Sequence, residues 1–156
     1  MIQILPKQFE NILPLAVEWA EAKEKVSLEH GTALSPQYMV DAKSVGVKYP
    51  ERVRIYEFPQ IPISEHPILR AAAEATQLIS PATIGISLGY GIFIHNNFSG
   101  DRYTIVHELV HTMQCEKLGG LDPFLNKYLM QCLTVGYPQA LMEQEAVRIA
   151  SEVCGI

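Results

Sequence analysis

The sequence predicts an α+β fold, in which several helices pack against a small antiparallel sheet of about three strands. In several long stretches the apolar residues recur every three or four positions, which is typical of amphipathic helices. Three short stretches are rich in β-branched and aromatic residues, which is typical of strands. No repeat, low-complexity tract or linker divides the chain of 156 residues. We therefore expect one domain over 1–156, with an N-terminal helical segment at 1–50 and a core at 51–156.

Two helices are expected in the N-terminal segment. Apolar residues repeat at helical spacing over 8–29, and Pro14 should either kink this helix or begin a second one. Ser35-Pro36 combines a capping residue with a proline at the first helical position, and Gly46 is a stop signal. These signals predict a short helix over 36–45.

The middle of the chain contains the predicted strands. Residues 52–58 alternate and are rich in β-formers, 59–67 contains three prolines and is a loop, and 68–79 is helical. Residues 83–88 and 91–95 are two further short strands. The Gly-Tyr-Gly sequence between them favours a hairpin turn.

Three helices are expected in the C-terminal third. The first spans about 103–118, with Asp101 as its cap and glycines at 119–120 as its end. The second begins at Asp122-Pro123, and a Gly-Tyr-Pro break separates it from the last helix at 139–154.

Composition excludes several classes of partner. The net charge of −5 gives no electrostatic support for nucleic-acid binding. No run approaches the ~18 apolar residues of a membrane span, so we expect no membrane partner. The first residues lack a basic region and are not expected to be a signal peptide. Three scattered cysteines, Cys115, Cys132 and Cys154, indicate buried free thiols in a reducing, cytoplasmic compartment.

The chemistry of the chain is indicated by His107-Glu108-Leu109-Val110-His111, an HExxH motif within the predicted helix 103–118. Two histidines four residues apart lie on one helical face and can reach one cation, for which Zn²⁺ is the usual occupant. Glu108 lies about 100° round the helix from His107, beside the ion, where it can act as a base. The alternative is a structural helix that carries two histidines by chance.

A catalytic zinc site needs a third protein ligand. The last helix offers Glu143 and Glu145, which lie about 200° apart round a helix, so only one can face the ion. Glu143 shares an apolar stripe with Ala146, Val147 and Ala150, whereas Glu145 lies on a mostly polar side. A carboxylate on a buried stripe needs compensation, which a cation would supply. We therefore prefer Glu143, and Glu145 stays the alternative.

These motifs resemble the gluzincin metallopeptidases, and among them the minigluzincins and small bacterial HExxH families. The resemblance covers roughly residues 51–150, in HELVH…Q at 107–114, the helix at 119–129 and the Gly-Tyr…Glu-x-Glu-Ala stretch at 136–146. It implies a zincin-like core around the active-site helix, with His107, His111 and Glu143 as zinc ligands. Many gluzincins have a carboxylate four residues after the ligand Glu, which orients a histidine. Here that position is Val147, so another group must hold His107 or His111.

The resemblance implies hydrolysis of a peptide or protein substrate. Zinc would activate water and polarise the carbonyl, while Glu108 would move the proton. For a second donor to the oxyanion we prefer Tyr137, with Tyr128, His95 and Arg102 as alternatives. By resemblance, an edge strand at 91–95 would bind an extended substrate.

Two competing interpretations stay open. The first is a latent or non-catalytic zinc module, closed by the N-terminal segment, in which only Asp41 and His30 are candidate ligands. The second is a metal-free protein that binds a partner in the groove between sheet and helices. We expect His30, His66 and His95 to be surface residues, and Gln114 either to bond nearby backbone or to face solvent. Nothing in the sequence indicates the substrate or the oligomeric state.

Overall fold

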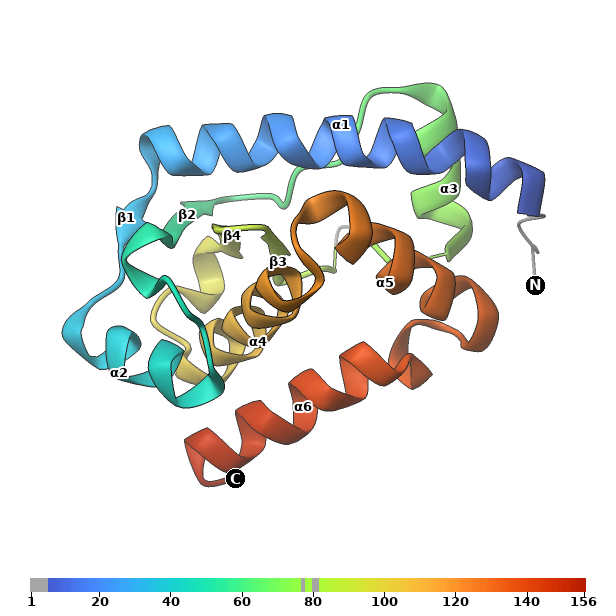
Figure 1. Ribbon diagram of the computed structural model, residues 1–156. Helices are drawn as coiled ribbons and strands as arrows, with labels where there is room; N and C mark the ends of the chain where they lie inside the picture. The colour runs from blue at the N-terminus through green and yellow to red at the C-terminus, as the bar shows by residue number, and fades with distance from the viewer. Residues whose placement is uncertain (1–5, 77, 80–81) are drawn as a thin grey trace.

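The computed structural model describes residues 6–76, 78–79 and 82–156 (Figure 1). Within these residues the fold is α+β, as predicted, with six α-helices and a small mixed sheet. The helices are α1 (Pro6–His30), α2 (Pro36–Val45), α3 (Pro67–Thr76), α4 (Arg102–Leu118), α5 (Leu121–Val135) and α6 (Leu141–Cys154). The strands are β1 (Thr32–Ala33), β2 (Arg54–Phe58), β3 (Gly85–Leu88) and β4 (Gly91–His95). Three short 3-10 turns are η1 (Pro50–Arg52), η2 (Asn96–Phe98) and η3 (Tyr137–Gln139).

The sheet differs from the prediction in size and direction. Its four strands lie in the order β1-β2-β4-β3, and the central pair, β2 and β4, is parallel. The chain leaves β2, passes through α3 and β3, and returns to lie beside β2, which is the long crossover that a parallel pair needs. The additional strand, β1, has only two residues, too few for alternation to reveal it.

Each face of the sheet packs against one principal helix. Ile92 and Ile94 of β4 belong to a core that includes α4, whereas Phe93 points to the other side. There it joins Ala20 of α1 in a second core, and its ring contacts Phe58 edge-on, with centroids 5.3 Å apart. Side chains alternate across a strand, so one strand serves both cores. Figure 1 shows α1 along one side of the sheet and α4 on the other.

Helix α4 has the predicted ends and is buried along most of its length. The Asp101 carboxylate accepts the N–H of Thr104, and Gly119 ends the helix in the left-handed conformation at φ 96°. The two neighbouring helices start differently from the prediction. Helix α5 begins at Leu121 with no side-chain cap, and α6 begins at Leu141 because η3 occupies the residues before it.

Helix α1 is continuous from Pro6 to His30, so Pro14 neither ends it nor begins a second helix. The helix approaches the β3–β4 turn closely. Glu24 accepts the backbone N–H of Tyr90 at 2.8 Å, and a Cβ on Gly91 would overlap the hydroxyl of Ser27. Gly91 is therefore required by the approach of α1, whereas the turn itself needs Gly89, which has a φ of 67°.

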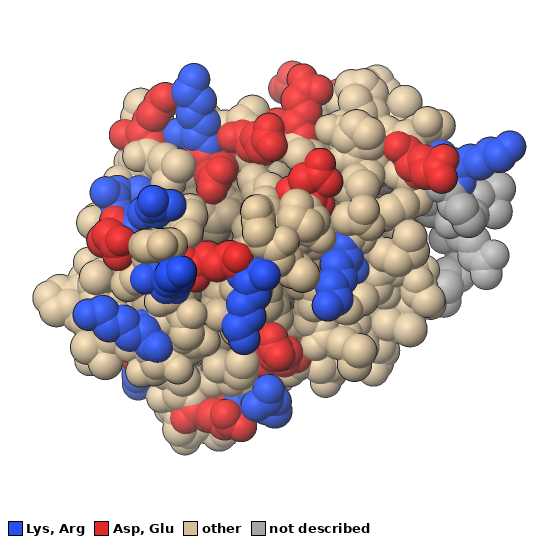
Figure 2. Space-filling model, viewed as in Figure 1, with Lys and Arg blue, Asp and Glu red and all other residues tan. Residues whose placement is uncertain are grey.

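The surface carries charges of both signs, and the cysteines are unpaired. Figure 2 shows acidic and basic side chains interspersed on one face of the molecule. None of the described helices has the length and apolar character to cross a membrane. All three cysteines are free; Cys115 and Cys132 are buried, whereas Cys154 is only half-buried.

Candidate metal centre

Two helices bring three potential ligands together. His107 and His111 lie one turn apart on α4, with ring centroids 5.1 Å apart. Glu143, in the first turn of α6, reaches both rings: its Oε1 lies 2.7 Å from His107 Nε2, and its Oε2 lies 3.1 Å from His111 Nε2. The structure therefore joins α4 and α6 through one buried carboxylate and two imidazoles.

This group has the composition and size of a metal site. The three potential ligand atoms all lie within 4.8 Å of one another. Two ligands of a tetrahedral zinc ion are separated by about 3.3 Å, given bonds near 2.0–2.1 Å. Small side-chain movements would bring His107, His111 and Glu143 to that spacing. Two histidines and one carboxylate also match the ligand types of catalytic zinc sites.

Burial and hydrogen bonding set the charge of Glu143. The residue is only 4% exposed, and burial favours its neutral form. The hydrogen bonds to His107 and His111 outweigh this effect and lower the pKa of Glu143 well below its usual value. Burial also opposes a charge on His111, but the bond to Glu143 and the charge of Glu108 raise the pKa of that imidazole.

The structure brings Glu143, and not Glu145, to the imidazoles. Glu145 instead accepts a hydrogen bond at 3.0 Å from the amide of Gln114, behind His111. The prediction that Glu143 shares a buried helical face with Ala146 and Ala150 is confirmed, because both alanines are fully buried. The same prediction was wrong for Val147, which is 41% exposed. The inward direction lies between Glu143 and Ala146, and Val147 is about 70° away from it at 100° per residue.

Gln114 is the residue that orients His111, a role for which the sequence analysis named no residue. Its Oε1 lies 2.8 Å from His111 Nδ1, and its amide nitrogen donates to the carbonyl of Met142 at 2.9 Å. These bonds define the amide orientation, so His111 Nδ1 donates to Gln114 and leaves Nε2 free for an ion. Gln114 lies three residues after His111 on one helical face, a spacing that is readable from the sequence.

Glu108 lies beside the imidazoles and packs against strand β3. It is 7% exposed, and burial raises the pKa of its carboxyl, although the neighbouring histidines partly oppose this. A Cβ added to Gly85 would lie 3.2 Å from Glu108 Oε1, so the glycine makes room for the carboxylate. A buried carboxyl with a raised pKa is suited to accept and return a proton.

Two tyrosines donate to Glu143 from one side of the group. The hydroxyl of Tyr128 lies 3.0 Å from Glu143 Oε2, and that of Tyr137 lies 3.3 Å from Oε1. Burial, and then the charge of Glu143, raises the pKa of both phenols, so both stay protonated donors. Tyr128 is held by an edge-on contact with His111, whereas Tyr137 is 38% exposed on η3.

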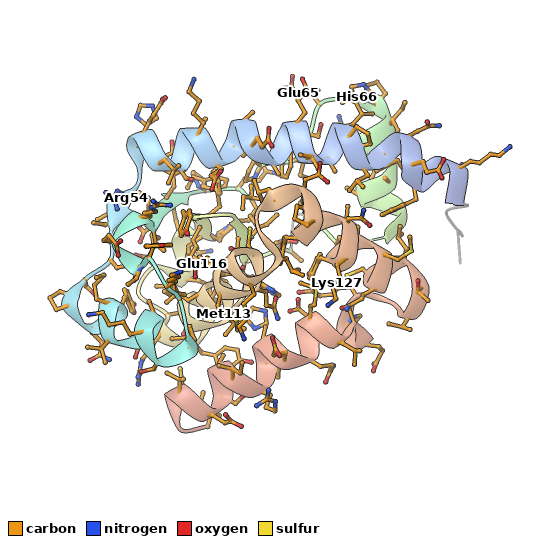
Figure 3. All side chains as sticks on the ribbon, in the orientation of Figure 1. Arg54, Glu65, His66, Met113, Glu116 and Lys127 are labelled. Carbon is orange, nitrogen blue, oxygen red and sulfur yellow. The ribbon has the colours of Figure 1, made fainter. Side chains whose placement is uncertain are left out.

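The other candidates lie elsewhere. Arg102 forms a bidentate pair with Asp41 at 2.9 and 3.0 Å, which removes both from the site. At the end of β4, His95 Nδ1 accepts a hydrogen bond from the backbone N–H of Asn97. His30 is exposed beside Glu29, and His66 is exposed at the start of α3 (Figure 3). Neither Asp41 nor His30 therefore supplies a closing ligand.

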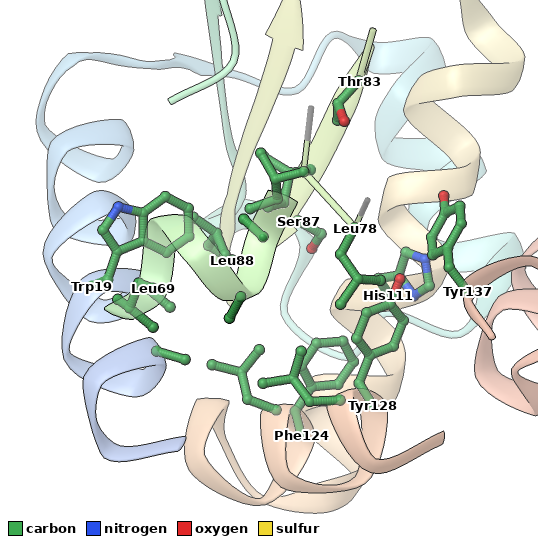
Figure 4. A pocket seen from close by; sticks show the side chains of 18 of the residues that line it. Trp19, Leu69, Leu78, Thr83, Ser87, Leu88, His111, Phe124, Tyr128 and Tyr137 are labelled. Carbon is green, nitrogen blue, oxygen red and sulfur yellow. The ribbon is translucent and has the colours of Figure 1, made fainter. Parts of the chain in front are cut away.

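A cavity of about 170 Å³ opens beside these residues (Figure 4). His111, Tyr128 and Tyr137 lie at one end of it, and Trp19 and Leu69 lie at the other. Strand β3 lines the cavity, and Ser87 Oγ is 3.2 Å from Thr112 Oγ1 of α4. The prediction of β4 as an edge strand was wrong, because β4 pairs on both sides; the strand at this edge is β3.

Comparisons of the chain with protein-family models, with curated proteins and with solved structures find no match. The resemblance to zinc peptidases therefore depends on the motif and on the arrangement of the three potential ligands.

Proposed function

We propose that this protein is a zinc-dependent peptide hydrolase of the gluzincin type, in which His107, His111 and Glu143 hold the ion. The observation that carries the proposal is the convergence of two imidazole Nε2 atoms and one buried carboxylate, with the carboxyl of Glu108 beside them. Two helices that pack together only for stability would not need two imidazoles and a carboxylate at one buried point.

Zinc, when bound, would polarise the scissile carbonyl and acidify the attacking water. The residues of the chain would perform the remaining steps. Glu108 would accept the proton of that water and pass it to the leaving amine. Tyr137 would donate to the oxygen on which negative charge develops, since its hydroxyl is protonated and lies beside Glu143, on a residue that is partly exposed.

The free edge of β3 supports a peptide as substrate. Within the described sheet β3 pairs only with β4, and Gly85 to Leu88 line the cavity. An extended chain laid along the edge would exchange main-chain hydrogen bonds with β3. The three free cysteines agree with a reducing compartment, which we propose to be the cytoplasm.

The test combines metal analysis with two substitutions. Purified protein should hold about one zinc ion per chain, which elemental analysis would measure. Glu108→Gln should keep the zinc and reduce cleavage of a mixed peptide library by ~10²–10⁴-fold, whereas His111→Ala should lose both. A Glu108→Gln protein as active as the wild type would falsify the assignment of the base. A wild type that neither binds zinc nor gains thermal stability from it would favour the metal-free interpretation.

A further inference from the structure

The cavity beside the candidate metal centre has two chemically different ends. Its described ionisable residues lie together at the metal end: His107, Glu108, His111, Tyr128, Tyr137 and Glu143. The rest of the lining is almost entirely apolar, and most of it comes from α1, α3, β3 and α5 (Figure 4). A ligand that fills this cavity must therefore present a polar, reactive group at one end and an apolar group at the other.

The apolar lining of the cavity comes partly from the N-terminal segment. Helix α1 contributes Ala16 and Trp19, α3 contributes Leu69, and α5 contributes Leu129 and Leu133. The part of this wall that α1 supplies lies outside residues 51–150, the stretch over which the sequence resembles the zinc peptidases. Figure 4 shows the six-membered ring of Trp19 directed toward the space between these helices.

The volume of the cavity is suited to one large side chain. An apolar cavity of ~150 Å³ is large enough to bind benzene, and the present cavity, with its metal end included, is about 170 Å³. A leucine or phenylalanine side chain would be removed from water there. A charged side chain would lose its hydration, and no described cation or acid lines the apolar end to compensate it.

We propose that the apolar end is a specificity pocket for a large aliphatic or aromatic side chain of a peptide substrate. The inference rests on the proposed hydrolase function and names its substrate class. We assign the pocket to a peptide because one edge of β3 has no strand beside it among the described residues, and this edge borders the same cavity. A lone acyl chain would leave the main-chain groups of that edge unpaired.

The chain contains one tryptophan, Trp19, so its fluorescence reports on the apolar end alone. The experiment titrates zinc-loaded Glu108→Gln protein with blocked pentapeptides that differ at one residue. Peptides with Phe or Leu should change the Trp19 emission and bind roughly 10–100-fold more tightly than those with Ala or Asp. Equal affinities for the four peptides would overturn the proposal.

Two further substitutions test the wall itself. Ala16→Phe should fill the pocket and abolish the preference for Phe and Leu. Ala22→Phe is the matched control, because Ala22 is an exposed residue of the same helix and does not line the cavity. Leu133→Ala should enlarge the pocket and shift the preference from Leu toward the larger Phe, measured by calorimetry. If Ala16→Phe does not fold, Leu133→Ala decides, and an unchanged preference there overturns the proposal.

The outcomes separate this inference from the hydrolase function. If peptides with Phe or Leu bind more tightly but the wild type cleaves none of them, the hydrolase function is refuted and the assignment of the pocket stands. Cleavage with no side-chain preference would refute the pocket and leave the function.

Discussion

The two ends of the cavity come from different parts of the chain, and different interactions hold them. The metal end consists of a five-residue motif on α4 and one carboxylate on α6, and hydrogen bonds of defined direction hold it. The apolar end consists of apolar side chains from elements that are distant in sequence, and only packing holds it. The difference teaches that directional chemistry leaves a local pattern in a sequence, whereas a pocket wall leaves only helical periodicity.

The largest expected effect tests whether the metal end depends on one carboxylate. Glu143→Ala removes the only acidic residue that contacts both imidazoles within the described chain, and zinc affinity should fall by more than ~100-fold. Glu145→Gln is the control, since an amide oxygen can still accept from Gln114. Competition with a chromophoric chelator measures both. Equal losses in the two variants would contradict the assignment of Glu143.

The second test asks which tyrosine acts on the substrate. Tyr137→Phe should lower kcat by ~10²–10³-fold with little change in KM, as expected when an oxyanion donor is removed. Tyr128→Phe should have a smaller effect, because the Tyr128 hydroxyl donates to Glu143 over the shorter distance, 3.0 Å against 3.3 Å for Tyr137, and Tyr128 is the less exposed residue. Steady-state kinetics on a cleaved peptide distinguish them. A larger loss of kcat for Tyr128→Phe would reverse the roles.

The third test concerns the bond that orients His111. Gln114→Leu should reduce zinc affinity by ~10–100-fold, because the imidazole loses its outer partner. Gln131→Leu makes the same change beside α6, where Gln131 accepts the N–H of Met142 without touching a histidine. That control should lose some thermal stability and keep its zinc affinity. Zinc titrations that give the same constant for Gln114→Leu and the wild type would remove Gln114 from the site.

The smallest expected effect concerns a residue of the N-terminal segment that supplies structure and no metal ligand. The hydrogen bonds from Arg102 lower the pKa of Asp41, although burial opposes this. Its folded pKa lies below the unfolded value of about 3.9, so the ionised form stabilises the fold above that pH. This contribution disappears as the pH falls through the folded pKa.

Asp41→Asn should therefore lower the free energy of unfolding by about 1 kcal/mol at neutral pH, a modest value because Arg102 is 44% exposed. The difference from the wild type should shrink below about pH 4. Urea denaturation at several pH values measures it, with Asp122→Asn, an exposed residue, as the control. A difference that does not change with pH would show that the pair contributes no charge effect.

The same contrast, between local patterns and contacts distant in sequence, explains which parts of the molecule could be predicted. The caps Ser35 and Asp101, the stop at Gly46 and the inward face of α6 that carries Glu143 are each determined by neighbours within one or two helical turns. The parallel pairing of β2 with β4 was not predicted, because strand direction depends on the path of the intervening chain. The role of α1 as a cavity wall was not predicted for the same reason: its partners are far away in sequence.

One glycine connects the sheet to the proposed base. Gly85 leaves room for the Glu108 carboxylate, and even an alanine there would require Glu108 or Ile94 to shift by a few tenths of an ångström. Related chains can therefore be sorted at this single strand position, independently of their histidines. A homologue that retains both histidines and the distant glutamate, but carries valine or leucine in place of this glycine, should have preserved the metal cage while abandoning turnover.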